Sequence, residues 1–325
     1  MVTDKLGNSI MQILFIAGQN DEERLRYKDF VSRWLAAFHN YSPELKIAVY
    51  PDDDFDSDDI EIVLIWKHPY GLLNKFKNLK AIQVMAAGVD HALGDKEFPN
   101  VPIARIVDPD MAKDLAQYAA AYVLKIIKRV DHWQKMQQQH QWAKQPPFNF
   151  SQLTIGVMGL GAMGRAAATM LANLDLQVIG WSRSSKSIEN VECYAENNEL
   201  GLFLSRTDIL ICMLPLTEAT RNILNLQLFK QLKPKAYIMN LGRGGHLIEE
   251  DLLFALENGI LSGAILDVFR VEPLPADHPF WSHPLITVTP HIASMSNPET
   301  AINQVVDNIY NVIYNQPLTN MIDII

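Results

Sequence analysis

The chain has little cysteine, no excess of basic charge and no apolar stretch at its start, and each shortage excludes a class of protein. Only two cysteines are present, and the apolar segment around Cys212 predicts a buried thiol, which suits a reducing cytoplasm. A formal net charge of -9 provides no basic surface for a phosphate backbone, so we expect no nucleic-acid partner. Residues 1–10 contain no long apolar run, and we expect neither a signal peptide nor a membrane anchor.

The composition favours a globular protein with more than one core. The 325 residues are 48% hydrophobic and 20% charged, which is ample for two compact domains. The acidic run at residues 52–59 invites comparison with a calcium site, but it lacks the glycine and the terminal glutamate of an EF-hand loop. We interpret it as a solvated connection between strands and expect no metal site.

Short apolar runs alternate with helical patterns along the chain, which is typical of parallel α/β sheets. The first series of expected strands is 13–17, 47–50, 62–66, 81–85 and 103–106. Helical spacing from residue 109 to about residue 137 then predicts one long connecting helix, and residues 145–148 predict a loop. The second series of expected strands is 153–158, 177–181, 209–214, 236–240, 264–268 and 285–288. The sequence therefore predicts an α/β fold with two doubly wound parallel sheets.

The last helix has clear start signals. Asn297 is an N-cap residue, Pro298 occupies the first helical position, and apolar residues recur at helical spacing up to Ile313. We expect this helix to return to the first domain. The expected domains are therefore residues 1–107, completed by 297–325, and residues 108–296.

A glycine-rich turn follows the first strand of the second series. Gly159, Gly161 and Gly164 have the spacing that permits a tight turn, a close approach to a pyrophosphate and a closely packed helix. The helix would begin near Ala162 and Met163, with its N-terminus facing the anion. The spacing alone is a weak signal, because glycines also mark ordinary turns from strand to helix.

Three ionisable residues follow other strands of the same series, namely Arg243, Glu272 and His291. Ligands of open parallel sheets bind beyond the carboxyl ends of the strands, which gives these positions functional weight. Taken singly, they are consistent with a helix-capping arginine, a surface glutamate and a core histidine. Together they supply a planar cation for a carboxylate, a proton donor and an anion to hold the donor's ring. Reduction of a 2-oxo acid needs this combination.

These motifs occur in order, and the chain resembles the D-isomer-specific 2-hydroxyacid dehydrogenase family. The resemblance rests on residues 159–164, 240–245, 266–273 and 289–291. It implies a flavodoxin-like substrate domain, a Rossmann cofactor domain and a homodimer formed through the cofactor domain. Segments 65–69 and 181–184 are most similar to the branch of the family that reduces glyoxylate and hydroxypyruvate.

The resemblance implies substrate-binding and catalytic roles in both domains. Arg243 would bind the substrate carboxylate together with backbone N–H groups near Ala87 and Gly88. His291, as an imidazolium, would donate its proton to the forming alkoxide, while Glu272 favours the charged ring and fixes its orientation. The cleft between the domains would close on substrate and exclude water.

Trp66 would border the substrate, although an aromatic side chain at a strand end is often core filling. The chemistry of the residues supports a small 2-oxo acid. Glyoxylate and hydroxypyruvate are implied by the resemblance alone.

The choice of cofactor depends on the end of the second strand after the glycine turn. Sites that favour NAD place an acidic residue about 20 residues beyond the turn, whereas this chain has Ser182, Arg183, Ser184 and Lys186 there. Without a carboxylate to repel a 2′-phosphate, NADPH (NADP when oxidised) is the expected cofactor. NADH, or a merely solvated basic loop, is the alternative. Further cofactor contacts implied by the resemblance are Leu214, Pro215, Leu241 and Asp267.

For Asp267 the alternative is a helix-capping or turn-forming role. Pro215 would also simply end a strand.

Other families share parts of this pattern. The β-hydroxyacid dehydrogenases have a similar glycine turn near the N-terminus, whereas a whole α/β domain precedes it here. Transcriptional corepressors of the C-terminal-binding type share the fold and the three ionisable residues, so a cofactor-sensing binding protein stays open, as does a reductase of another 2-oxo acid. We expect no regulatory domain after the last helix, which disfavours the longer phosphoglycerate dehydrogenases.

Overall fold

The computed structural model of the protein describes residues 12–144 and 152–322. The expectations for residues 1–10 and for the loop at 145–148 lie outside these ranges. The chain divides into two compact units, which we call unit 1 (Met1–Pro109 with Ser296–Ile325) and unit 2 (Asp110–Met295).

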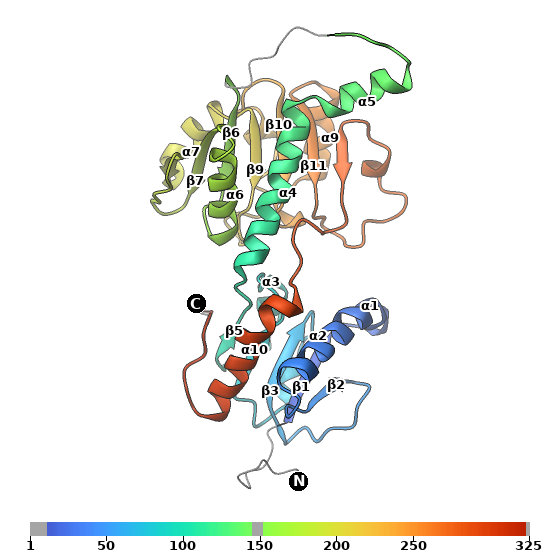
Figure 1. Ribbon diagram of the computed structural model, residues 1–325, viewed down its shortest axis with the longest axis vertical. Helices are drawn as coiled ribbons and strands as arrows, with labels where there is room; N and C mark the ends of the chain where they lie inside the picture. The colour runs from blue at the N-terminus through green and yellow to red at the C-terminus, as the bar shows by residue number, and fades with distance from the viewer. Residues whose placement is uncertain (1–11, 145–151, 323–325) are drawn as a thin grey trace. The chain divides into compact units, whose positions relative to one another are not determined.

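Unit 1 is built on a five-stranded parallel sheet in the order β2-β1-β3-β4-β5, which is the flavodoxin order (Figure 1). Its strands are β1 Gln12–Ala17, β2 Ile47–Tyr50, β3 Ile60–Trp66, β4 Ala81–Val84 and β5 Ile103–Ala104. Its helices are α1 Asp21–Arg26, α2 Lys28–Tyr41, α3 Asp90–Leu93 and α10 Pro298–Ile313, with a 3-10 turn, η1, at Leu73–Lys75.

The last helix starts as the sequence predicts and belongs to the core of unit 1. The Asn297 side chain accepts the N–H of Glu299, and Pro298 is the first helical residue. α10 packs against α2 and β4. Asn308 of α10 is buried and donates to the side chain of Gln83 on β4 at 2.9 Å. A hydrogen bond thus fixes the helix over the sheet in addition to apolar packing.

Unit 2 is built on a seven-stranded parallel sheet in the order β12-β11-β10-β9-β6-β7-β8, the Rossmann order. Its strands are β6 Thr154–Met158, β7 Gln177–Ser182, β8 Glu192–Ala195, β9 Ile209–Cys212, β10 Ala236–Asn240, β11 Leu261–Leu266 and β12 Ile286–Val288. Its helices are α4 Pro109–Ile127, α5 Val130–Gln138, α6 Ala162–Ala172, α7 Glu196–Ser205, α8 Leu226–Phe229 and α9 Glu249–Glu257, with 3-10 turns η3 Gly244–His246 and η4 Pro279–Trp281.

One apolar cluster joins α4 and α6 to this sheet and another joins α7, α8 and α9 to it, so the strands are covered on both faces. Coverage on both faces explains why the expected strands were continuous apolar runs. Cys212 is fully buried, as the sequence predicts.

The structure corrects the expectation of one long connecting helix. α4 ends at Ile127 and α5 begins at Val130, because Arg129 lies between them with φ +54°, in the left-handed region. The indole Nε1 of Trp133 donates to the Lys128 carbonyl at 3.0 Å, in place of a main-chain donor of a continuous helix. Apolar residues keep their helical spacing on both sides, so periodicity does not reveal the break.

The structure also contains β8, an edge strand that the sequence analysis missed. Only Tyr194 of its four residues is buried, so no apolar run marks it. The two expected strands that are shortened most are β9, which ends at Cys212, and β5, which spans only Ile103–Ala104.

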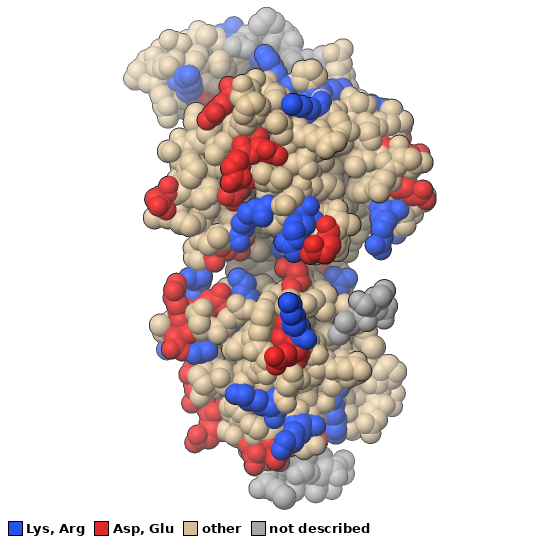
Figure 2. Space-filling view, turned by 180° about the vertical axis from the view of Figure 1, so that it is seen from behind, with Lys and Arg blue, Asp and Glu red and all other residues tan. Residues whose placement is uncertain are grey.

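The surface carries charges of both signs. Acidic and basic side chains are interspersed over the face shown in Figure 2. In the acidic run, Asp53 accepts the N–H of Val49 and Asp56 accepts that of Asp58. Among the described residues, no three His, Cys, Asp or Glu side chains form a group that could hold a metal ion. Within the same ranges, every helix is too short or too polar to cross a bilayer.

A buried, hydrogen-bonded histidine–aspartate couple lies beyond the end of β3. His68 is fully buried, and its Nε2 lies 3.0 Å from Oδ2 of Asp95, which also accepts the N–H of Gly71. Burial lowers the pKa of His68 despite the hydrogen bond from its ring to Asp95. Burial alone would raise the pKa of the Asp95 carboxyl, but its N–H donors outweigh burial and hold that pKa below its usual range.

We expect this couple to make unit 1 less stable as the pH falls. The pKa of His68 is lower in the folded chain than its unfolded value of about 6.5, so below that pH the unfolded chain takes up the proton first and the free energy of unfolding decreases. Replacing His68 with Gln should flatten this dependence between about pH 7 and pH 5.

Urea unfolding followed by circular dichroism measures the effect, with His39→Gln, an exposed histidine of α2, as the control. Equal pH slopes for wild type and His68→Gln would refute the assignment.

Candidate active site

The loops that follow the strands of unit 2 meet at one edge of its sheet, because all seven strands are parallel. The residues expected to bind a cofactor, and the three ionisable residues, lie in the loops after β6, β7, β9, β10, β11 and β12, except Ser182, which ends β7, and residues 162–164, which begin α6. The fold therefore gathers segments that are distant in sequence at one edge.

The glycine turn after β6 has the form of a phosphate cradle. Gly159 has φ +105°, and its N–H donates to the Trp181 carbonyl at 2.8 Å. A Cβ on Gly164 would lie 1.7 Å from the Gly159 carbonyl oxygen, so only glycine allows the helix to pack there. A Cβ on Gly161 would meet nothing within 4 Å. The open backbone at Gly161, at the start of α6, fits a dinucleotide pyrophosphate.

The segment after β7 offers hydroxyl and basic groups. Ser182 is buried, and its hydroxyl donates to the Ser184 carbonyl at 2.7 Å. Arg183, Ser184 and Lys186 are exposed. The turn is thus folded on itself, and its two cations face solvent.

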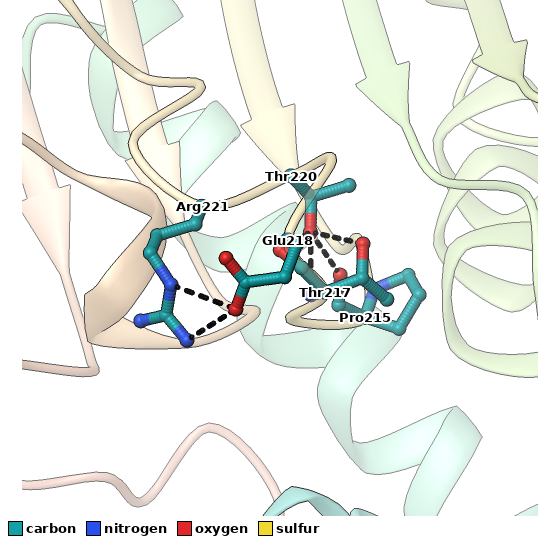
Figure 3. Close-up of polar contacts among 5 residues, drawn as sticks. All are labelled: Pro215, Thr217, Glu218, Thr220 and Arg221. Carbon is teal, nitrogen blue, oxygen red and sulfur yellow. Dashed lines mark hydrogen bonds and ion pairs between the residues drawn. The ribbon is translucent and has the colours of Figure 1, made fainter.

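The loop after β9 is held by its own side chains (Figure 3). The Thr220 hydroxyl donates to the Pro215 carbonyl at 2.6 Å and accepts the N–H of Thr217 at 2.8 Å. Arg221 and Glu218 form an ion pair at 3.3 Å on the outside of the loop. Leu214, near the start of the loop, is buried. The carbonyl of Pro215 therefore has a fixed position next to the sheet.

The Arg243 loop after β10 packs closely on its neighbours. A Cβ on Gly244 would lie 1.9 Å from the carbonyl carbon of Phe269, which explains the glycine. The buried Asn240 side chain donates to the Arg243 carbonyl at 3.0 Å and accepts the Gly242 N–H at 3.2 Å. The guanidinium of Arg243 is half-buried and donates to the Gly242 carbonyl. Leu241 is buried.

Glu272 and His291 come together, although 19 positions separate them in sequence. Nδ1 of His291 lies 2.9 Å from Oε2 of Glu272, and the other carboxylate oxygen accepts the N–H of Phe269 at 3.0 Å. The His291 side chain is 39% exposed. A carboxylate that orients Nδ1 prepares Nε2 to donate or accept a proton.

Asp267 has the turn-forming contacts named as its alternative. It is 1% exposed, and its carboxylate accepts the Thr289 hydroxyl at 2.6 Å and the N–H groups of Ile292 and Ala293 at 2.9 Å each. The Tyr118 hydroxyl lies 2.5 Å from the Thr289 hydroxyl. Burial raises the pKa of Tyr118, so this phenol stays protonated.

The residues expected to bind substrate from the first domain lie in unit 1. Trp66 ends β3 half-buried, with its ring centroid 4.7 Å from that of His91. Arg105 donates to the Ala87 carbonyl at 3.1 Å. The N–H groups of Ala87 and Gly88 donate to no protein acceptor among the described residues, so they are suited to an anion.

His246 is the residue that the sequence analysis missed. It is fully buried in the Arg243 loop, and both ring nitrogens have backbone partners. The available signal was a histidine inside a glycine-rich segment at the carboxyl end of a strand, three positions after Arg243.

Similar proteins cover nearly the whole chain. Residues 120–293 match the family described as D-isomer specific 2-hydroxyacid dehydrogenase, NAD binding domain. Glyoxylate/hydroxypyruvate reductase A of Serratia proteamaculans is 39% identical over 299 residues, which are 90% of this chain and 95% of that protein.

Two solved structures are also similar. A D-isomer specific 2-hydroxyacid dehydrogenase from Xanthobacter autotrophicus, in complex with NADPH and MES, has a TM-score of 0.87 at 32% identity and covers 97% of this chain and 98% of its own. An NADPH-dependent glyoxylate/hydroxypyruvate reductase from Sinorhizobium meliloti, in complex with NADP and sulfate, has a TM-score of 0.86 at 32% identity, with 96% and 98% covered.

Gly161 and Gly164 have opposite surroundings, so alanine at each position tests whether the glycine turn binds the dinucleotide phosphates. Gly164→Ala should lower the melting temperature, because its Cβ would overlap a backbone oxygen. Gly161→Ala should keep the melting temperature, because its Cβ meets nothing, yet weaken dinucleotide binding by about tenfold or more by filling space that the phosphates need. Fluorescence titration with NADPH and thermal unfolding measure both. Unchanged NADPH affinity in Gly161→Ala would contradict the cradle.

Proposed function

The chain belongs to the D-isomer specific 2-hydroxyacid dehydrogenase family, and on this premise we propose that it reduces small 2-oxo acids to 2-hydroxy acids. It is an NAD(P)-dependent enzyme of the glyoxylate/hydroxypyruvate reductase type, and we assign glyoxylate and hydroxypyruvate as its substrates. The observation that carries the proposal is the 2.9 Å contact between His291 and Glu272, at the sheet edge that also bears Arg243 and the glycine turn.

The proton of the reaction comes from His291. When bound, a reduced nicotinamide supplies a hydride to the carbonyl carbon of the substrate. As the C=O π bond breaks, the oxygen takes a proton from Nε2 of His291, so a hydroxyl forms and the imidazole becomes neutral. Glu272, held on Nδ1, stabilises the imidazolium before transfer and keeps the ring in position.

The substrate carboxylate needs a cationic side chain that is held in one orientation. We assign this role to Arg243, because its planar guanidinium can bind both carboxylate oxygens and its loop is held by Asn240. We further propose that the N–H groups of Ala87 and Gly88 bind substrate oxygens, and that Trp66 limits the size of the substrate. The resemblance and the unused N–H groups support this.

Replacing the proton donor should stop turnover and leave cofactor binding intact. In His291→Ala we expect kcat to fall by about 100- to 10,000-fold, because general acid catalysis is lost, while the Kd for NADPH stays near the wild-type value. Glyoxylate reduction and NADPH titration measure the two quantities. His283→Ala is the control, because among the described residues the His283 ring accepts only the N–H of Leu285. Near-normal turnover of His291→Ala would remove His291 from this role.

We propose NADPH as the preferred cofactor, with NADH the weaker alternative. The support is the segment after β7, where exposed Arg183 and Lys186 accompany the hydroxyls of Ser182 and Ser184 and no carboxylate stands to repel a 2′-phosphate. We assign the glycine turn, with Ala162 and Met163, to the pyrophosphate. Leu214, Pro215 and Leu241 are assigned to the rest of the dinucleotide. For Asp267 we propose turn formation in addition to any contact with the carboxamide.

The preference has a direct test. Arg183→Ala should lower kcat/KM with NADPH by about ten- to a hundredfold and leave kcat/KM with NADH almost unchanged, because only NADPH carries the 2′-phosphate. Steady-state rates with both cofactors measure the ratio. Arg206→Ala is the matched control, since Arg206 is paired with Glu192 at the edge strand. Equal loss with both cofactors would count against a phosphate contact.

We also propose a cytoplasmic homodimer. Its support is the resemblance, together with two cysteines that form no disulfide and the exposed side chains of Trp133 and Trp142 in unit 2, which are 40% and 93% exposed.

A further inference from the structure

We propose that His246 is a positioning residue, whose buried ring joins the loop of Arg243 to the loop of Pro215 and so aligns the substrate cation with the cofactor site. The proposal rests on the function proposed above. His246 touches neither reacting atoms nor substrate in this account, and it acts through the two loops that it connects.

Both nitrogens of the His246 ring are engaged by backbone groups. Nδ1 accepts the N–H of Arg243 at 3.1 Å. A nitrogen that accepts carries no hydrogen, so the neutral ring has its hydrogen on Nε2, and Nε2 donates to the Pro215 carbonyl at 3.3 Å. This tautomer follows from the hydrogen-bond pattern. The ring therefore forms a bridge with a fixed direction, from the amide of Arg243 to the carbonyl of Pro215.

The main chain of Arg243 has few ways to move. Its N–H is held by the His246 ring, and its carbonyl accepts both the Asn240 side chain at 3.0 Å and the N–H of His246 at 3.1 Å. Because both backbone groups are held, the main-chain position from which the Arg243 side chain extends is fixed. The precision of a carboxylate contact depends on that position.

Position 242 must be glycine because a side chain there would collide with the His246 ring. A Cβ there would lie 2.9 Å from Cε1 of His246 and 3.0 Å from the Leu214 carbonyl oxygen. The ring, the Arg243 loop and the start of the cofactor loop thus occupy one closely packed space. His246 is fully buried in that space, where an unsatisfied polar atom is costly.

The other end of the bridge is equally well defined. The Pro215 carbonyl accepts the Thr220 hydroxyl at 2.6 Å as well as Nε2 of His246, and Figure 3 shows how the Thr220 side chain reaches it. A displacement of the Pro215 loop would therefore move the His246 ring and, through it, the main chain of Arg243.

Two isosteric replacements separate the two halves of the bridge. In His246→Asn, the side-chain oxygen can lie where Nδ1 lies, so the acceptor for Arg243 is kept and the donor to Pro215 is lost. In His246→Gln, the longer side chain can place its amide near Nε2, so the donor to Pro215 is kept and the acceptor for Arg243 is lost.

We expect the two variants to weaken the binding of different ligands. His246→Gln should weaken oxamate binding to the NADPH-loaded protein, and raise the KM for glyoxylate, by about tenfold, with NADPH affinity close to wild type. His246→Asn should weaken NADPH binding by about tenfold and change oxamate affinity less. Calorimetry with oxamate and fluorescence titration with NADPH measure both without turnover. His278→Gln, which replaces a histidine paired with Glu249 elsewhere in unit 2, should leave both affinities unchanged.

A merely structural role predicts a different outcome. Loss of thermal stability, with the two affinities reduced alike in both variants, would overturn the proposal, and so would unchanged affinities. If the wild-type protein itself bound NADPH but neither bound oxamate nor reduced any 2-oxo acid, the proposed function would fail, and the positioning role would fail with it.

Discussion

The turn that carries His291 depends on one buried carboxylate. Asp267 is 1% exposed, and a carboxylate in such a place is tolerated only when its oxygens are hydrogen bonded. The Thr289 hydroxyl and two consecutive N–H groups meet that need and tie residues 289–293 to the Asp267 carboxylate. In this turn, His291 adopts φ +57° and its N–H donates to the Asp267 carbonyl at 2.8 Å. Its Nδ1 then faces Glu272, so the orientation of the ring follows from the burial of a different residue.

Close backbone approaches complete the site. Gly244 lets the Arg243 loop lie against Phe269, whose N–H holds Glu272, and the His246 ring joins that loop to Pro215. The Arg243 loop, the His291–Glu272 pair and the Pro215 loop are therefore mechanically connected within unit 2. Residues connected in this way are expected to act as one unit, so the effects of their substitutions should not add.

The sequence predicts β10 well because parallel strands buried on both faces are continuous apolar runs, and the bounds of β10 match the prediction. The bounds of β2 also match, although none of its four residues is buried, because its residues form an unbroken hydrophobic run. It predicts the start of α10 because capping is local. It does not predict the break at Arg129, where the Trp133 indole donates to the Lys128 carbonyl. Nor does it predict β8, because only one side chain of that strand is buried. His246 was missed because its role depends on Pro215, 31 positions away.

A structure with NADPH and oxamate bound tests the central claim most directly. The account predicts that the oxamate carboxylate lies on the Arg243 guanidinium, and that its carbonyl oxygen lies within about 3 Å of Nε2 of His291, with Glu272 still on Nδ1. Oxamate bound away from Arg243, or a His291 ring turned so that Nε2 faces away from the ligand, would contradict it.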